Sequence, residues 1–100
     1  MANTKAEAIK DIKDYILNNG GNYSKWYVGI ASDVKQRLFN DHAVDEKNGL
    51  WAWAQCQDAD TAREVEDFFV YTLGTQGGPG GGDDTTKCVY AYKITAITKE

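Results

Sequence analysis

The sequence predicts a small α+β domain in which three helices pack against a three-stranded antiparallel sheet. Two observations carry this prediction. Three segments have apolar residues at helical spacing, and three short segments rich in aromatic and β-branched residues alternate with them. The chain has 100 residues, of which 42% are hydrophobic, and this suits a single modest core. We therefore expect residues 1–100 to form one α+β unit.

The first expected helix lies near the N-terminus. Thr4 and Glu7 have the spacing of a capping box, in which each side chain accepts a hydrogen bond from the backbone N–H of the other residue. Isoleucines then recur at helical spacing and predict one apolar face, formed by Ile9, Ile12 and Ile16. The run Asn18-Asn19-Gly20-Gly21 should end this helix, because glycine readily takes the left-handed cap conformation.

The run Trp26–Ile30 is the best strand signal in the first half of the chain, and we expect this strand at the centre of the sheet. A second helix should follow at once, since Asp33 can cap it and Gln36 stands three residues later. Val34 and Leu38 give this helix an apolar side.

The second expected strand is Leu50–Cys56. Trp51 and Trp53 alternate along it and should therefore point to the same face of the sheet. That face meets either the core or a ligand, and the spacing alone leaves both interpretations open.

The third helix should begin at a capping pair, Thr61 and Glu64, and end at Gly74. The run GTQGGPGGGDDTT after it is expected to be a mobile hairpin or lid. It is no P-loop, because it follows a helix and lacks the closing Lys-Ser/Thr. A nest of backbone N–H groups for an anion is the open alternative. The last strand, Cys88–Ile94, should pair antiparallel with Trp26–Ile30.

Composition limits the class of protein. The net charge of −4 argues against a broad basic surface for nucleic acid, although a small local basic cleft is compatible with it. The polar N-terminus and the lack of a long apolar run predict a cytoplasmic protein with no signal peptide and no membrane contact. Cys56 and Cys88 are expected to be reduced, buried thiols, and His42 cannot build a metal site by itself.

One carboxylate falls inside an apolar stripe. Glu66 lies between Ala62 and Phe69 on one face of the third helix, and Arg37 has apolar neighbours on the second helix. A buried charge is costly unless it is paired. Two interpretations stay open: a structural ion pair between Arg37 and Glu66, or a polar cleft between two helices and the sheet.

These residues carry a resemblance to a known family. The run YVGIASDVKQRL is similar to the second-strand motif of the GIY-YIG nucleases, and the run AREVEDFFVYTLGTQGG resembles their glutamate segment. The matching positions are Tyr27, Gly29, Asp33, Val34, Arg37 and Leu38 in the first motif, and Ala62, Glu66, Phe69 and Val70 in the second. The resemblance covers about half of the chain, from Trp26 to Gly78.

The family's first strand has no counterpart before Tyr27. Cys88-Val89-Tyr90, near the C-terminus, resembles that missing strand, with Tyr90 in the position of its tyrosine. A circular permutation would explain this order, because a strand needs its neighbour in the sheet and not a particular place in the sequence.

The resemblance implies a metal-dependent endonuclease that hydrolyses DNA phosphodiesters. By this resemblance Glu66 holds a divalent metal, Mg²⁺ or Mn²⁺, Arg37 stabilises the charge on the phosphate, and Tyr27 or Tyr90 orients or deprotonates the attacking water. The implied substrate contacts are Gly29, Lys25, Lys35 and His42.

The alternative comes from another class of protein. In this interpretation the chain is a catalytically degenerate module of the same fold that binds nucleic acid or a protein partner, or that forms a homo-oligomer. The acidic net charge favours it, as does the glycine that stands where the family has an asparagine after the glutamate. Trp51 and Trp53 would then stack on bases or on a partner's side chains.

Overall fold

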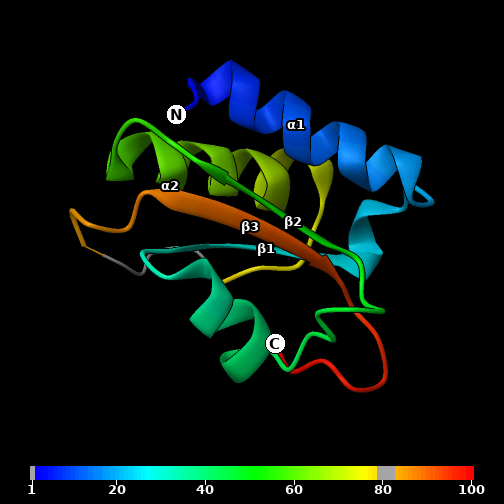
Figure 1. Ribbon diagram of the computed structural model, residues 1–100. Coiled ribbons are helices and arrows are strands. Elements are labelled where there is room, and N and C mark those ends of the chain that lie inside the picture. The colour runs from blue at the N-terminus through cyan, green and yellow to red at the C-terminus, as the bar shows by residue number, and fades with distance from the viewer. Residues whose placement is uncertain (1, 79–82) are drawn as a thin grey trace.

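A computed structural model describes residues 2–78 and 83–100 of the chain. The expected alternation of helices and strands is confirmed, with a short 3-10 turn added before the first strand (Figure 1). The elements are α1 (Lys5–Asn18), η1 (Tyr23–Lys25), β1 (Trp26–Ala31), η2 (Gln36–Asp41), β2 (Trp51–Gln55), α2 (Ala59–Asp67), η3 (Phe68–Leu73) and β3 (Cys88–Lys93). The fold is therefore the expected small α+β arrangement.

The three strands form one antiparallel sheet in the order β1-β3-β2. The expected antiparallel pairing of the last strand with the first is confirmed, and it places Gly29 opposite Tyr90. The expectation that the first strand is central was wrong, because β3 lies in the middle and β1 lies at the edge. Burial explains this order: four successive residues of β3, 89–92, are fully buried, as a strand covered on both faces requires.

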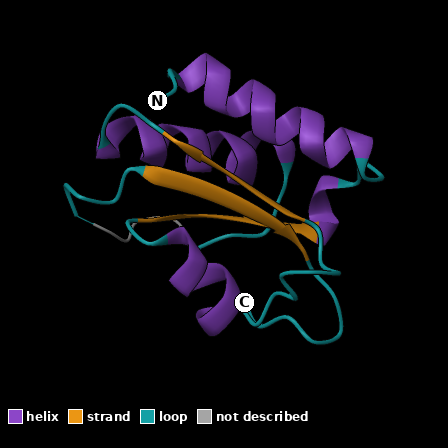
Figure 2. Ribbon diagram, in the orientation of Figure 1, coloured by secondary structure: helices purple, strands orange, loops and turns teal. Residues whose placement is uncertain are grey.

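Helices cover both faces of the sheet, as Figure 2 shows. Helices α1 and α2 pack on one face, where Val89 and Ala91 of β3 join the larger core. Helix η2 packs on the other face, where Tyr90 and Tyr92 join a smaller core with Leu38. Because side chains alternate along a strand, both tyrosines of β3 point to the η2 side.

The two tryptophans of β2 lie on the η2 side and have different environments. Trp51 packs edge-on against Phe39, with ring centroids 5.1 Å apart. Trp53 is 49% exposed. The core interpretation therefore holds for Trp51, whereas Trp53 is a surface residue.

The helix ends follow the expected chemistry with one exception. Thr4 and Glu7 form the capping box of α1, and Gly74 ends η3 in the left-handed conformation with a φ of +87°. The third helix starts earlier than expected, because the Asp58 side chain accepts a hydrogen bond from the Thr61 N–H at 2.7 Å. Glu64 instead lies 3.4 Å from the Lys5 ammonium on the surface, so the expected Thr61–Glu64 capping box is wrong.

The first part of the glycine-rich run packs against β1. The Val28 N–H donates to the Gln76 carbonyl at 3.0 Å, and the Gln76 N–H donates to the Trp26 carbonyl at 2.8 Å. A Cβ on Gly77 would lie 2.7 Å from the Val28 carbonyl oxygen, so only glycine allows this approach. Residues 75–78 are thus an extension of the sheet edge and no free loop. The expected hairpin or lid, and the alternative anion nest, fall largely on residues 79–82, outside the described residues.

Both cysteines are free thiols, as expected. Cys56 is fully buried, as expected, and burial raises its pKa to about 11, whereas Cys88 is only half-buried and departs from the expected burial. Within the described residues no helix is both long and apolar enough to cross a membrane.

Candidate functional site

A cleft of about 320 Å³ lies along the edge of β1, between η2 and α2. The side chains that resemblance assigns to catalysis all line it, and each comes from a different element: Tyr27 from β1, Arg37 from η2, Glu66 from α2 and Tyr90 from β3. Segments far apart in the sequence thus converge on one concave surface, as the resemblance requires.

Glu66 is the most unusual residue of this cleft. It is 2% exposed, and its Oε1 has no hydrogen-bond partner among the described residues. Burial, reinforced by the charge of Asp67 and opposed by that of Arg63, raises the pKa of Glu66 to about 7. A buried carboxylate with an unsatisfied oxygen is unfavourable by itself, so the cleft is suited to a cation at this position.

Arg37 forms no ion pair with Glu66 in the part of the chain that the structure describes. Its guanidinium Nη1 lies 3.4 Å from the Asp41 Oδ2, one turn further along η2. A hydrogen bond to Tyr90 also raises the pKa of Arg37. Of the two open interpretations, the structure therefore shows the polar cleft and not the structural ion pair.

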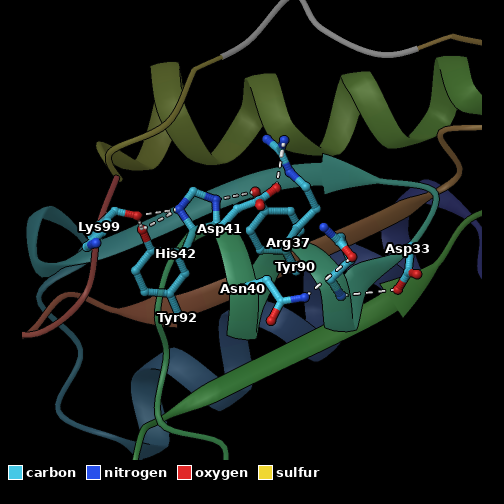
Figure 3. A network of polar contacts seen from close by, with 9 residues as sticks. Asp33, Arg37, Asn40, Asp41, His42, Tyr90, Tyr92 and Lys99 are labelled. Atoms are coloured by element: carbon cyan, nitrogen blue, oxygen red, sulfur yellow. Dashed lines mark hydrogen bonds and ion pairs between the residues drawn. The ribbon is translucent and has the colours of Figure 1, made fainter.

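The Tyr90 hydroxyl lies between Arg37 and His42 (Figure 3). His42 Nε2 is 2.7 Å from this hydroxyl, and His42 Nδ1 is 2.6 Å from the Lys99 carbonyl oxygen. A carbonyl only accepts, so Nδ1 carries the proton of the neutral ring and Nε2 accepts from Tyr90. Burial keeps the ring neutral by lowering the pKa of His42. Burial also raises the pKa of Tyr90 to about 12, although the hydrogen bond from Arg37 opposes this effect.

The structure places the expected substrate contacts differently. His42 is 4% exposed and lies behind Tyr90, outside the cleft lining, so it positions Tyr90 and does not meet a ligand. Lys25 lies at the far end of β1, beside Lys93. Lys35 lines a neighbouring groove and not the cleft. Of these four candidates, the cleft holds Gly29 alone.

Gly29 leaves room for the side chain of Tyr90, which lies opposite it in the sheet. A Cβ at this position would lie 2.5 Å from the Tyr90 hydroxyl oxygen and 2.6 Å from the adjoining ring carbon. The glycine therefore makes space for the ring of Tyr90, a role that differs from the substrate contact implied by the resemblance.

Sequence reasoning missed two members of the site. The Tyr92 hydroxyl lies 3.1 Å from His42 Nδ1, and the Lys99 backbone carbonyl accepts from that nitrogen. The alternation of Tyr90 and Tyr92 could have identified the first. A backbone carbonyl carries no sequence signal, because every residue has one.

The carboxylates that line the cleft are the groups that could bind a metal, and Glu66 is the buried one among them. Among the described residues no group of three or more His, Cys, Asp or Glu side chains could hold a metal ion. Asp33 also lines the cleft, but its Oδ1 accepts from the Gln36 N–H at 3.1 Å. The unsatisfied Oε1 of Glu66 fits a hard divalent cation that takes its remaining ligands from water and a substrate phosphate.

Comparison of the chain with models of known protein families, with curated proteins and with solved structures finds no match. The resemblance to GIY-YIG nucleases therefore rests on the two motifs and on the cleft that their residues form.

Proposed function

We propose that this protein is a metal-dependent endonuclease of GIY-YIG type that hydrolyses DNA phosphodiesters. The observation that supports the proposal is the convergence of Tyr27, Arg37, Glu66 and Tyr90 on one cleft, where Glu66 is buried and its Oε1 has no hydrogen-bond partner among the described residues. Within the described residues Glu66 forms no ion pair and its Oε1 has no hydrogen-bond partner, whereas phosphodiester hydrolysis would give this buried carboxylate a role.

Glu66 would hold a Mg²⁺ or Mn²⁺ ion, which when bound supplies positive charge to the phosphate. Arg37 is 47% exposed at its side chain and borders the same cleft, so its guanidinium can donate to a non-bridging phosphate oxygen. This contact strengthens as negative charge develops on the phosphate.

Tyr90 is better placed than Tyr27 to accept a proton from the attacking water. Its own proton already points to His42 Nε2, so the hydroxyl can pass that proton inward while it takes one from water. The water oxygen then forms the new bond to phosphorus, the bond from phosphorus to the leaving oxygen breaks, and the departing alkoxide takes a proton from solvent water. Tyr27 is only half-buried, and its ring stacks on Tyr92 at 5.3 Å, which suits it to orient the water or the sugar at the rim.

The test is cleavage of supercoiled plasmid and of branched DNA with Mg²⁺ or Mn²⁺. Glu66→Gln should abolish cleavage and leave DNA binding similar or slightly stronger, because it removes both a metal ligand and a charge that repels phosphate. Arg37→Ala should lower the rate by about 10²–10³, the effect of losing one transition-state donor. Glu64→Gln, on the exposed side of the same helix, is the matched control and should cleave like wild type.

A wild-type protein that binds these DNAs without metal-dependent cleavage would reject the nuclease and support the degenerate binding module. If the wild-type protein neither binds nor cleaves these DNAs, the result rejects the nuclease and also a DNA-binding module.

A further inference from the structure

A second groove, of about 490 Å³, lies on the η2 side of the sheet next to the cleft. Its floor comes from β2 and β3, through Trp53, Gln55 and Cys88, and its walls come from the turn after β1 and the chain before β3. None of the residues that resemblance assigns to catalysis lines this groove.

Trp53 is the largest exposed side chain in the groove. Its side chain is 49% exposed, whereas that of Trp51, two residues earlier on the same strand, packs against the smaller core. In the register of the sheet Trp53 lies opposite Tyr90, which itself lines the cleft. An indole held by a strand offers a rigid flat surface on which a base can stack.

Two lysines stand in the same groove. Lys35 comes from the segment that leads into η2, and Lys87 comes directly before β3. Both are exposed, and neither forms an ion pair within residues 2–78 and 83–100. Their ammonium groups are therefore available to the phosphates of a strand that lies in this groove.

The groove and the cleft share a border, because Ser32 and Asp33 line both. Asp33 is the acidic group on this border, and its carboxylate is engaged in capping η2. A bound polymer that passes from the cleft over Ser32 can therefore reach Trp53 along the surface of the domain.

From these observations we propose that the groove binds an unpaired DNA strand next to the phosphodiester that the cleft cuts, with a base stacked on Trp53 and phosphates on Lys35 and Lys87. The proposal rests on the proposed function and specifies its substrate: DNA with a single-stranded segment beside the cut, such as a branch or a flap. A duplex keeps its bases stacked on one another, so only an unpaired base can lie flat on the indole.

The experiment measures equilibrium binding of fluorescein-labelled DNA by the full chain in EDTA, where no cleavage occurs. Three probes of equal length are compared: a single strand, a blunt duplex, and a duplex with an unpaired arm. Trp53→Ala should weaken binding of the single strand and the armed duplex by roughly 5- to 150-fold, the range for losing one base stack. Trp53→Phe should recover most of this loss, because phenylalanine still offers an aromatic face.

Matched controls separate stacking from charge and from general surface effects. Tyr71→Ala removes an aromatic side chain that is 75% exposed at the far end of the α2–η3 helix, and it should leave binding unchanged. Lys35→Ala and Lys87→Ala should each reduce the slope of log K against log salt by about 0.7, the value for one phosphate contact with a single strand. Lys10→Ala, on α1 across the sheet, should leave that slope unchanged.

The outcomes separate the two proposals. If wild type cleaves DNA but Trp53→Ala binds all three probes as wild type does, the groove proposal is wrong and the nuclease stands. If Trp53→Ala weakens the blunt duplex as much as the single strand, the groove is not specific for unpaired bases and the proposal is again wrong. If wild type binds none of the probes and also cleaves no DNA with Mg²⁺ or Mn²⁺, both proposals fail, and a protein partner becomes the occupant to test for Trp53.

Discussion

Two titratable side chains close to Tyr90, Glu66 and His42, are buried, and burial moves their pKa values in opposite directions. Burial raises the pKa of Glu66 from its ordinary 4.5 to about 7 and lowers the pKa of His42 below its ordinary 6.5. The folded protein therefore favours the neutral form of each side chain. Between pH 4.5 and 7 Glu66 makes folding less favourable as pH rises, whereas His42 makes it less favourable as pH falls below 6.5. In wild type the two effects partly cancel, so single variants are needed to separate them.

Glu66→Gln should stabilise the protein at pH 8 in EDTA. The amide stays neutral, whereas the wild-type carboxylate must ionise in a buried position, and a shift from 4.5 to about 7 corresponds to roughly 3 kcal/mol as an upper figure. The advantage of the variant should shrink as pH falls through 7 and vanish near pH 4, where the wild-type group is protonated in both the folded and the unfolded states.

Urea denaturation at several pH values measures this difference. Glu64→Gln on the exposed side of α2 is the control and should show no such pH dependence. A Glu66→Gln variant that is less stable than wild type at pH 8 would mean that the carboxylate has a structural partner that stabilises it.

At the scale of elements, the pairing of β1 with β3 builds the side of the cleft that carries Tyr27 and Tyr90. The register puts Gly29 opposite Tyr90 and Tyr27 opposite Tyr92, so a tyrosine from each strand faces η2. The outer edge of β1 is held by the backbone hydrogen bonds to Gln76, which bring the chain after η3 to the border of the cleft. Any change that moves Tyr90 away from β1 should therefore disturb its contacts with Arg37 and His42.

Gly29→Ala tests this arrangement. The new methyl group would lie 2.5 Å from the Tyr90 hydroxyl oxygen, so the ring must move or the strands must separate. We expect a loss of about 1–3 kcal/mol in the free energy of unfolding, the usual cost of overpacking. The loss is steric, because the backbone of Gly29 does not have a positive φ.

A double-mutant cycle with Tyr90→Ala identifies the cause. When the Tyr90 ring is absent, the additional cost of Gly29→Ala should fall close to zero, which would give a large coupling energy between the two sites. Additive losses in thermal or urea denaturation would show that Gly29 is required for another reason.

For the whole molecule, the three layers leave Glu66 buried, with no hydrogen-bond partner for its Oε1 among the described residues, and a bound cation would stabilise the charged form of this side chain. Addition of Mn²⁺ or Mg²⁺ should therefore raise the thermal midpoint of wild type without any DNA. A ligand at 100 times its Kd contributes about 2.7 kcal/mol, and for a domain of this size each kcal/mol raises Tm by roughly 4–8 °C.

This metal effect should be larger at pH 8 than at pH 6, because a carboxylate with a pKa of about 7 must lose its proton to bind. Glu66→Gln should show no metal-dependent shift, while Glu64→Gln should respond as wild type does. An equal shift in both variants would place the metal elsewhere on the protein.

The sequence by itself determined the local structure of this protein. Capping residues and helical spacing predicted α1, alternation predicted the three strands, and Gly74 predicted the end of the third helix, because these features depend on neighbours along the chain. Motif register also selected Glu66, Arg37, Tyr27 and Tyr90 as the residues to meet in one place.

Only the tertiary structure decided how strands and charges are arranged. Strand β3 lies in the centre, since the order in a sheet depends on which strand can be covered on both faces. The same packing buried His42 behind Tyr90, left Trp53 exposed, and moved Lys25 and Lys35 out of the cleft. In the same packing Arg37 pairs with Asp41 and hydrogen-bonds to Tyr90, and within the described residues it forms no ion pair with Glu66. These outcomes depend on distances between segments that are far apart in sequence, and spacing along the chain carries no information about such distances.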